Sequence, residues 1–308
     1  MTVTRIGFAY NPTIEAAIEL SSRAAGWCQV RGIGEWQLPS GDTEGLVREL
    51  ETTDVLVVLG GDGTFLRAAM AVTLVDVPLI GINLGKVGFL SKAEAGDMEH
   101  VLAAIAAGDF SLEERMALEG RILRGAATTR RAPTASATPA VAATPPASGA
   151  QASAGPPIER LVALNDIVVA RGSLARVCRL EVAIDDSHLA TFIADGLVVS
   201  SPTGSTGYSF SAGGPILDPG SRNLIVTPIA AYLSAIRSVV VGPSQVVRCT
   251  VVDAFEALVS VDGREDLPLA VGDVVEVRAM DRPIRLVVPR GAQPFWDLLR
   301  QKVELLPS

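Results

Sequence analysis

A glycine-rich segment, Gly60-Gly61-Asp62-Gly63-Thr64, carries the residues best suited to chemistry in this chain. It directly follows the apolar run 54–59 and precedes a helical pattern, so its peptide N–H groups are expected at a helix N-terminus, which favours negative charge. The glycines would let a phosphate group approach the backbone closely. Asp62 would accept or orient the proton of a hydroxyl nucleophile and help to hold a metal ion. The segment therefore predicts phosphate chemistry with Asp62 as the catalytic residue.

The spacing of this segment matches neither of the two common nucleotide-binding loops. It lacks the lysine of the Walker-type phosphate loop and the glycine pattern of the Rossmann dinucleotide fingerprint, and the first strand-like run ends in Asn11-Pro12 rather than in glycines. The pentapeptide resembles instead the turn shared by NAD kinases, by diacylglycerol and sphingosine kinases and, less closely, by phosphofructokinases. By itself it does not choose among them, and a plain tight turn is the structural alternative.

A long second motif, Asp195–Ile216, favours one of these families. It supplies a carboxylate at the start of a strand, followed by a hydroxyl- and glycine-rich loop whose donors and acceptors suit a ribose, an amide or a base edge. In this segment the resemblance to NAD kinases is close and long. That resemblance implies phosphoryl transfer from ATP or polyphosphate to the adenosine-ribose 2′-hydroxyl of NAD, giving NADP, with Mg²⁺ or Mn²⁺ as the divalent metal.

Three further segments resemble the same family: 83–90, 164–166 and 261–263. Read alone, the second and third could equally be hairpin turns. The resemblance assigns NAD binding to Asp62, Gly63, Phe89, Asn165, Asp166, Asp195, Thr203, Thr206, Gly207, Tyr208, Ser211 and Asp262. It assigns the phosphate donor to Gly60, Gly61, Gly63, Thr64 and Arg67, although Arg67 and Lys86 could also be solvated surface charges. No set of metal ligands is assigned.

The chain departs from the family pattern at four places, one of which is the segment 125–157, which has no counterpart in the family. Asn165-Asp166 stands for the usual Asn-Glu pair, which keeps the charge but shortens the reach by a methylene. Gly207 replaces a frequent alanine, and the histidine expected within 230–238 is absent. These departures leave a catalytically weak NAD-binding sensor as one alternative function. A lipid or sphingoid-base kinase is the other, although the Asp195–Ile216 motif is not typical of that class.

The elements that must position these residues fall into two kinds. Apolar runs at 54–59 and 77–82 predict buried parallel strands, and helical patterns at 13–25, 43–51, 65–75 and 96–107 alternate with them. This alternation predicts a doubly wound α/β domain with ligands at the carboxyl ends of its strands. Short β-branched runs then predict an all-β, sandwich-like region at 161–171, 176–184, 194–200, 246–252, 257–261, 274–280 and 284–288.

The expected domains are 1–117 and 118–290, with a final amphipathic helix within 291–308 that packs back on the first domain. The segment 125–157 is almost wholly Ala, Thr, Pro, Ser and Gly, which predicts a disordered insertion within the second domain.

The composition of this 308-residue chain limits which classes of partner and which cellular setting are expected. A formal net charge of −8 excludes a globally basic surface, so neither nucleic acid nor a membrane is expected as a partner. The longest apolar stretch, 224–241, contains Pro228 and Arg237 and is not expected to span a membrane. Three isolated cysteines and a first segment without a leader pattern predict a reducing, cytoplasmic setting. The family resemblance implies a homo-oligomer, either a dimer or a tetramer.

Overall fold

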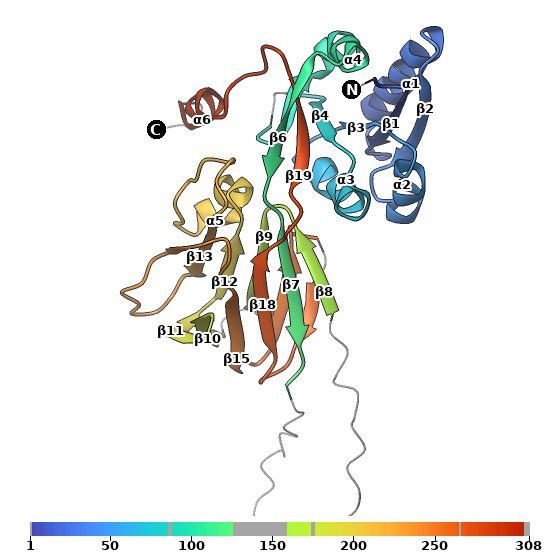
Figure 1. The fold of residues 1–308 in the computed structure, drawn as a ribbon. Helices are drawn as coiled ribbons and strands as arrows, with labels where there is room; N and C mark the ends of the chain where they lie inside the picture. Colours follow the sequence, from blue (N-terminus) through green and yellow to red (C-terminus); the bar gives the residue numbers. More distant parts are fainter. Residues whose placement is uncertain (1, 86–87, 126–158, 174–175, 265, 305–308) are drawn as a thin grey trace, which may run out of the picture.

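The structure is a computed structural model that describes residues 2–85, 88–125, 159–173, 176–264 and 266–304, and it divides into an α/β half and a β-rich half (Figure 1). Lys86 lies outside the described residues, as does all but the first residue of the expected insertion 125–157.

The α/β half is built on a seven-stranded sheet with the order β2-β1-β3-β4-β19-β6, in which β5 also pairs with β4. Its strands are β1 Arg5–Tyr10, β2 Gly34–Pro39, β3 Val55–Leu59, β4 Leu79–Asn83, β5 Ser91–Glu94, β6 Phe110–Arg115 and β19 Ile284–Pro289. Its helices are α1 Glu15–Val30, α2 Thr43–Leu50, α3 Asp62–Val75 and α4 Met98–Ala107, with the short 3₁₀ helix η1 Ala95–Asp97.

Helices cover both faces of this sheet. Leu56 and Val58 of β3 share a core with α2 and α3, whereas Val55 and Val57 share a second core with α1 and α4. Successive strand residues point to opposite faces, so the unbroken apolar run of β3 supplies both cores. The predicted doubly wound α/β domain is confirmed.

The β-rich half consists of two six-stranded sheets, ordered β11-β10-β15-β18-β7-β8 and β14-β13-β12-β9-β16-β17. One core holds apolar residues of both sheets, such as Val182 and Val247 from the first and Val169 and Leu197 from the second. The predicted sandwich-like region is therefore confirmed. Its strands are β7 Leu118–Leu123, β8 Glu159–Ala163, β9 Asp166–Arg171, β10 Cys178–Ile184, β11 Ser187–Ala194, β12 Gly196–Ser200, β13 Leu224–Ile229, β14 Val239–Val241, β15 Val247–Asp253, β16 Ala257–Val261, β17 Asp266–Leu269 and β18 Val274–Ala279.

Strand β19 differs from the sequence prediction. The run 284–288 was grouped with the all-β region, but β19 pairs with β4 and β6 and so belongs to the sheet of the α/β half. A β-branched run has the same composition in either sheet, and only long-range pairing decides between them. Helix α3 also begins at Asp62, earlier than the predicted start at Phe65.

Two neighbouring strand crossings join the halves. Strand β6 continues through Met116 and Ala117 into β7, and β18 leads into β19, which pairs with β6 (Figure 1). After β19 the chain forms α6, Phe295–Glu304, whose Phe295 ring lies 6.1 Å from that of Phe89 in the α/β half. The prediction that this helix packs back on the first domain is confirmed.

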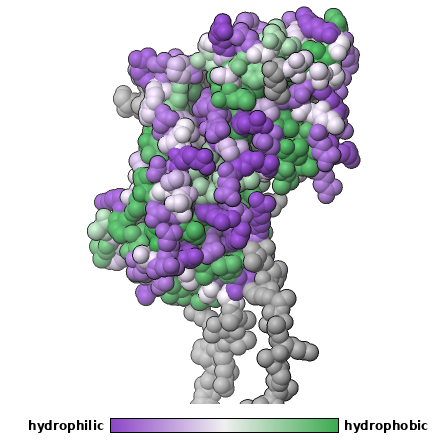
Figure 2. All heavy atoms as spheres, viewed as in Figure 1, coloured by the Kyte–Doolittle hydropathy of each residue, from purple (hydrophilic) through white to green (hydrophobic). Residues whose placement is uncertain are grey.

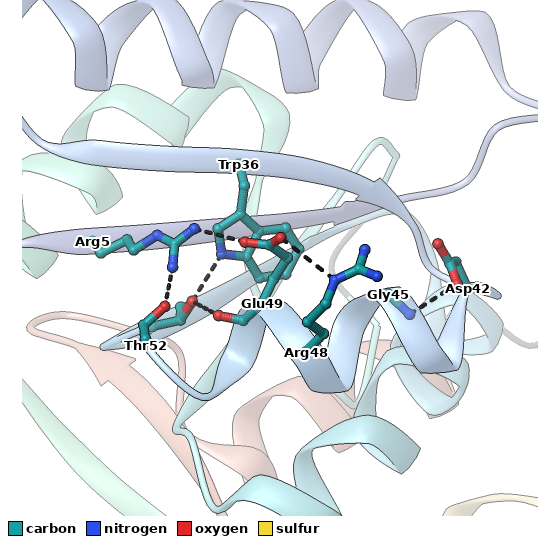
Figure 3. Close-up of polar contacts among 8 residues, drawn as sticks. Arg5, Trp36, Asp42, Gly45, Arg48, Glu49 and Thr52 are labelled. Atoms are coloured by element: carbon teal, nitrogen blue, oxygen red, sulfur yellow. Dashed lines mark hydrogen bonds and ion pairs between the residues drawn. The ribbon is translucent and has the colours of Figure 1, made fainter.

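Polar contacts fix α2, which packs beside α3 on the same face of the sheet (Figure 3). The carboxylate of Asp42 caps the helix by accepting a hydrogen bond from Gly45 N at 3.0 Å. Near its other end Arg5 of β1 pairs with Glu49 at 2.6 Å. Trp36 of β2 donates from Nε1 to Thr53 Oγ1 at 2.8 Å. These contacts hold α2, and through it α3, against the sheet.

The viewed surface of the protein is mixed in polarity (Figure 2), and the three cysteines are buried. Figure 2 shows hydrophilic and hydrophobic residues interspersed over both halves of the viewed face. Cys28, Cys178 and Cys249 are buried and free, as predicted. Within the described ranges, no helix has the length and apolar character needed to cross a membrane.

Gly7 of β1 provides a test of the strand pairing. It is paired in register with Trp36, and a Cβ added at Gly7 would overlap the indole ring. We expect Gly7→Ala to lower the free energy of unfolding by about 1–3 kcal/mol, the usual cost of overpacking a core. Urea denaturation would measure this loss.

Gly26→Ala in α1 is the matched control, because a Cβ there meets nothing within 4 Å. Replacing a helical glycine by alanine should raise stability by about 0.5–1 kcal/mol. Equal stability of Gly7→Ala and the wild type would contradict the close contact with Trp36.

Candidate active site at the junction of the two halves

The glycine turn after β3 leaves room for a ligand at the start of α3. Gly60 has φ 153°, and a Cβ there would overlap the side chain of Thr64, so the turn requires glycine at this position. A Cβ at Gly61 or Gly63 would instead face open space. The first-turn peptide N–H groups of a helix have no intrahelical acceptor, so this open side suits a phosphate group.

Asp62, the first residue of α3, is held by the loop that precedes β5. Its Oδ2 accepts a hydrogen bond from Phe89 N at 3.3 Å and its Oδ1 accepts one from Leu90 N at 3.4 Å. A Cβ at Gly88 would overlap the carboxylate, and Gly88 N donates to Ser91 Oγ at 2.6 Å. Burial raises the pKa of Asp62 above its usual range, opposed by the two N–H donors and the charge of Lys302. The loop thus positions a carboxyl group of raised basicity.

In the β-rich half, Asp262 organises the segment before β9. Its fully buried carboxylate accepts hydrogen bonds from the backbone N–H groups of Leu164 at 3.0 Å, Asn165 at 2.8 Å and Asp166 at 3.1 Å. With all three bonds directed at one side chain, Asp262 fixes the backbone that presents Asn165 and Asp166.

Asp166 and Asn165 have polar atoms left over for a ligand. Asp166 is the first residue of β9 and is only 5% exposed. Burial, together with the charge of Asp262, raises the pKa of Asp166 to about 7. Asn165 Oδ1 is buried and has no hydrogen-bond partner among the described residues. A buried polar atom of this kind is expected to have a partner, which a bound ligand can supply.

The hydroxyl-rich loop packs directly on these two residues. Ser201 N donates to Asn165 O at 2.8 Å, and Ser201 Oγ donates to Leu164 O at 2.5 Å. The 3₁₀ helix η2, Thr203–Thr206, follows, and a Cβ at Gly204 within it would overlap the backbone of Asn165. A Cβ at Gly207 would lie 3.3 Å from Gly204 O and 3.9 Å from Asn165 Nδ2 and Asp166 Oδ2, so an alanine at this position would press on the backbone of η2.

Arg115, at the end of β6, connects this loop to the α/β half. Arg115 is 2% exposed. Its Nη1 donates to Thr203 Oγ1 at 3.5 Å, and its Nη2 lies 2.7 Å from Glu113 Oε1. Glu113 also pairs with Lys92 at 2.9 Å. The sequence analysis missed Arg115, although an arginine inside a strand-like run that leads into an apolar segment was a usable signal.

The remaining predicted residues are placed differently from one another. Arg67 donates from Nε to Ser40 Oγ at 3.3 Å and from Nη2 to Thr64 Oγ1 at 3.4 Å, so it borders the glycine turn. Thr206 Oγ1 donates to Thr203 O at 3.4 Å. Tyr208 and Ser211 form the ends of the short helix α5, Tyr208–Ser211, and both are exposed.

Asp195 is not brought together with the other predicted residues. It precedes β12, whose far end, Ser200, pairs with Asp166, and strands rise about 3.3 Å per residue. Asp195 instead forms an ion pair with Arg171 at 2.8 Å. The full length of a strand therefore separates Asp195 from Asp166 within one chain.

The acidic residues at the site do not form a metal-binding cage. In the part of the chain that the structure describes, no three His, Cys, Asp or Glu side chains lie close enough to hold a metal ion. Asp62 remains as a single carboxylate beside the open glycine turn. This suits a Mg²⁺-type ion that takes one or two carboxylates and completes its shell with substrate phosphates and water.

Comparison with known proteins covers both halves. The family model described as ATP-NAD kinase N-terminal domain matches residues 6–110, and the ATP-NAD kinase C-terminal domain matches residues 164–288. The chain is 36% identical over 310 residues to an NAD kinase from Heliobacterium modesticaldum, covering 97% of this chain and 98% of the relative. It is 39% identical over 251 residues to an NAD kinase from Symbiobacterium thermophilum, covering 81% and 78%.

Two solved structures share the fold. A yeast NADH kinase complexed with NADH superposes with a TM-score of 0.73 at 23% identity, covering 99% of this chain and 88% of that one. An NAD kinase from Archaeoglobus fulgidus in complex with ATP gives a TM-score of 0.70 at 22% identity, covering 98% and 100%.

Asp262→Asn tests the structural role of the buried carboxylate. The amide has one acceptor oxygen and no charge, so part of the three-donor arrangement is lost. We expect a loss of about 1.5–3 kcal/mol in the free energy of unfolding, the range for a hydrogen bond to a charged group. Asp266→Asn on the neighbouring strand β17 is exposed and should be neutral. Equal stability of the two variants would contradict this role.

The raised pKa of Asp166 predicts a pH-dependent stability. Between about pH 4 and pH 7 the folded protein holds a proton that the unfolded chain has lost, so stability falls as pH rises through this window. Asp166→Asn removes this dependence and should be more stable than the wild type above pH 7, as measured by urea denaturation across pH.

A ¹³C NMR titration provides the direct measurement. One carboxyl resonance should titrate with a midpoint near pH 7 and be missing in Asp166→Asn. A wild-type spectrum in which every aspartate titrates below pH 5 would contradict the prediction.

Proposed function

Because the chain belongs to the NAD kinase family and is a kinase that acts on NAD, we propose that it transfers the terminal phosphoryl group of ATP or polyphosphate to the adenosine-ribose 2′-hydroxyl, giving NADP. The observation that carries the proposal is the position of Asp62. Its carboxylate lies at the N-terminus of α3, fixed by the 88–91 loop beside the open glycine turn.

Asp62 acts as the general base in this proposal. It accepts the proton of the 2′-hydroxyl while the ribose oxygen bonds to the terminal phosphorus. The bond between that phosphorus and its bridging oxygen breaks, and ADP or the shortened polyphosphate leaves with the bonding electrons. The raised pKa of Asp62 favours the proton transfer, since a carboxylate of higher pKa is the stronger base.

The donor phosphates are bound by the turn that precedes Asp62. Gly61 and Gly63 have no side chain between the backbone and the open space, so the N–H group of Gly63 can contact phosphate oxygens. The helix dipole of α3 favours the same negative charge. Arg67, already bonded to Thr64, supplies a nearby positive charge.

A divalent ion, Mg²⁺ or Mn²⁺, fits beside Asp62 as part of the proposal. Asp62 would be its protein ligand, with the remaining ligands taken from the donor phosphates and water. When bound, the ion neutralises negative charge on the transferring phosphoryl group.

The adenosine part of NAD is proposed to lie between Phe89 and the segments 165–166 and 203–208. Asn165 Oδ1, which lacks a partner among the described residues, and the Asp166 carboxyl group would contact the ligand. Asp195 lies a strand length from Asp166, and we propose that it contacts the NAD bound by a second copy of the chain. The proposal therefore includes a homo-oligomer. We also expect a cytoplasmic enzyme, in keeping with three free buried cysteines.

A purified-protein assay with ATP or polyphosphate and with NAD or NADH, read by the appearance of NADP or NADPH, identifies donor and acceptor together. Absence of product with every donor, despite NAD binding seen as a rise in melting temperature, would favour the sensor alternative.

Asp62→Asn is the central test. The variant should fold and bind NAD, while kcat for NADP formation falls by about 10²–10⁴-fold, the usual contribution of a general base. Asp76→Asn, in the left-handed position that caps the other end of α3, is the matched control because asparagine tolerates that conformation. Wild-type kcat in Asp62→Asn would contradict the proposed role.

A further inference from the structure

Helix α6 contacts the loop that holds Asp62. The Phe295 ring lies 6.1 Å from the Phe89 ring, and the Lys302 ammonium lies over the same ring, 5.3 Å from its centroid. Phe89 N is one of the two backbone donors to the Asp62 carboxylate. The C-terminal helix therefore packs on the residue that positions the proposed base.

The same helix also contacts the β-rich half of the site. Trp296 donates from Nε1 to Asp218 Oδ2 at 3.2 Å, and Asp218 lies in the segment that follows α5. The Trp296 ring packs edge-on against the Phe295 ring, with 5.0 Å between the ring centroids. In Figure 1, α6 lies above α5, and the segment 290–294 connects it to β19. Helix α6 thus has contacts with both halves, one on each side of the proposed site.

Lys302 differs from the other cations around Asp62 in having no carboxylate partner among the described residues. Arg115 and Lys92 both pair with Glu113, and Arg67 is bonded to Ser40 and Thr64. Lys302 has only the cation–π contact with Phe89, which holds the ammonium while leaving its N–H donors free. Its positive charge acts on the Asp62 carboxyl group.

We propose that Lys302 of the C-terminal helix is a phosphate-binding residue of this active site, with its ammonium contacting oxygens of the donor's terminal phosphoryl group. This inference rests on the proposed function. Lysine binds phosphate as a compact point charge with three donors, and on an acidic chain such a charge beside the base offsets repulsion between Asp62 and the donor. Phe89 would keep Lys302 aligned, so the aromatic contacts of α6 serve to position a charge.

The test compares Lys302→Met, Lys302→Arg and Arg300→Met. Lys302→Met keeps the length of the side chain but removes the charge, and kcat/KM for the donor should fall about 10- to 100-fold, as expected for a hydrogen bond to a charged group. KM for NAD should change little. Lys302→Arg should retain most of the activity, and Arg300→Met, on the same helix and mostly exposed, should behave as the wild type.

Two further readouts separate charge from packing. Because salt screens a charge–charge contact, the fall of kcat/KM for the donor with rising salt concentration should be weaker in Lys302→Met than in the wild type, and Lys302→Arg should keep it. Inorganic tripolyphosphate, titrated calorimetrically into the full-length protein, should bind more weakly to Lys302→Met by the same factor. The melting temperature should stay unchanged, since Lys302 is partly exposed.

Wild-type donor kinetics, salt dependence and tripolyphosphate affinity in Lys302→Met would overturn the proposal and leave α6 as an apolar cover. An equal loss in Lys302→Arg and Lys302→Met would also overturn it, because the charge would then not be the cause. Failure of the proposed function is distinguishable, since in that case the wild type itself forms no NADP.

Discussion

The rest of the site depends on the hydrogen bonds by which the 88–91 loop holds the Asp62 carboxylate. A carboxylate at the end of a buried strand would ordinarily turn toward water, but two backbone N–H groups, from Phe89 and Leu90, hold it at the start of α3. This hydrogen-bonded arrangement is possible only because Gly60 adopts a left-handed φ and Gly88 has no Cβ. Partial burial then raises the pKa of Asp62, so the geometry that positions the base also strengthens it.

The second requirement is that the two halves keep a constant relation to each other. Paired strands run through the junction, β6 with β19 on one side and β7 with β18 on the other. At the crossing, buried Arg115 joins Glu113 of the α/β half to Thr203 of the hydroxyl-rich loop. Separating the halves would take the Thr203 acceptor away from this buried guanidinium, while its ion pair with Glu113 of the same strand would remain. Strand pairing and the Arg115–Thr203 hydrogen bond together hold the hydroxyl-rich loop against the α/β half.

Sequence reasoning succeeded where a local pattern has one structural meaning. The apolar run before Gly60 required a buried strand, and alternating helices required a doubly wound sheet. It failed where partners are distant in the chain. The run 284–288 could have joined either sheet. Nor could the sequence show that Asp195, the first residue of the hydroxyl-rich motif, lies at the opposite end of β12 from Asp166. Arg115 was missed because its importance lies in Glu113 and Thr203, and the latter contact spans 88 residues.

The charge balance of the site explains why so few cations suffice. The chain has a net charge of −8, yet both proposed substrates carry negatively charged phosphate groups. Backbone N–H groups can bind phosphate without adding a side-chain charge that needs a counter-ion. In the β-rich half, the Asp262 carboxylate accepts hydrogen bonds from three backbone N–H groups. The raised pKa of Asp166 keeps its carboxyl group partly neutral near pH 7. A neutral Asp166 both donates and accepts hydrogen bonds, so it can bind a ribose hydroxyl without repelling the neighbouring phosphates.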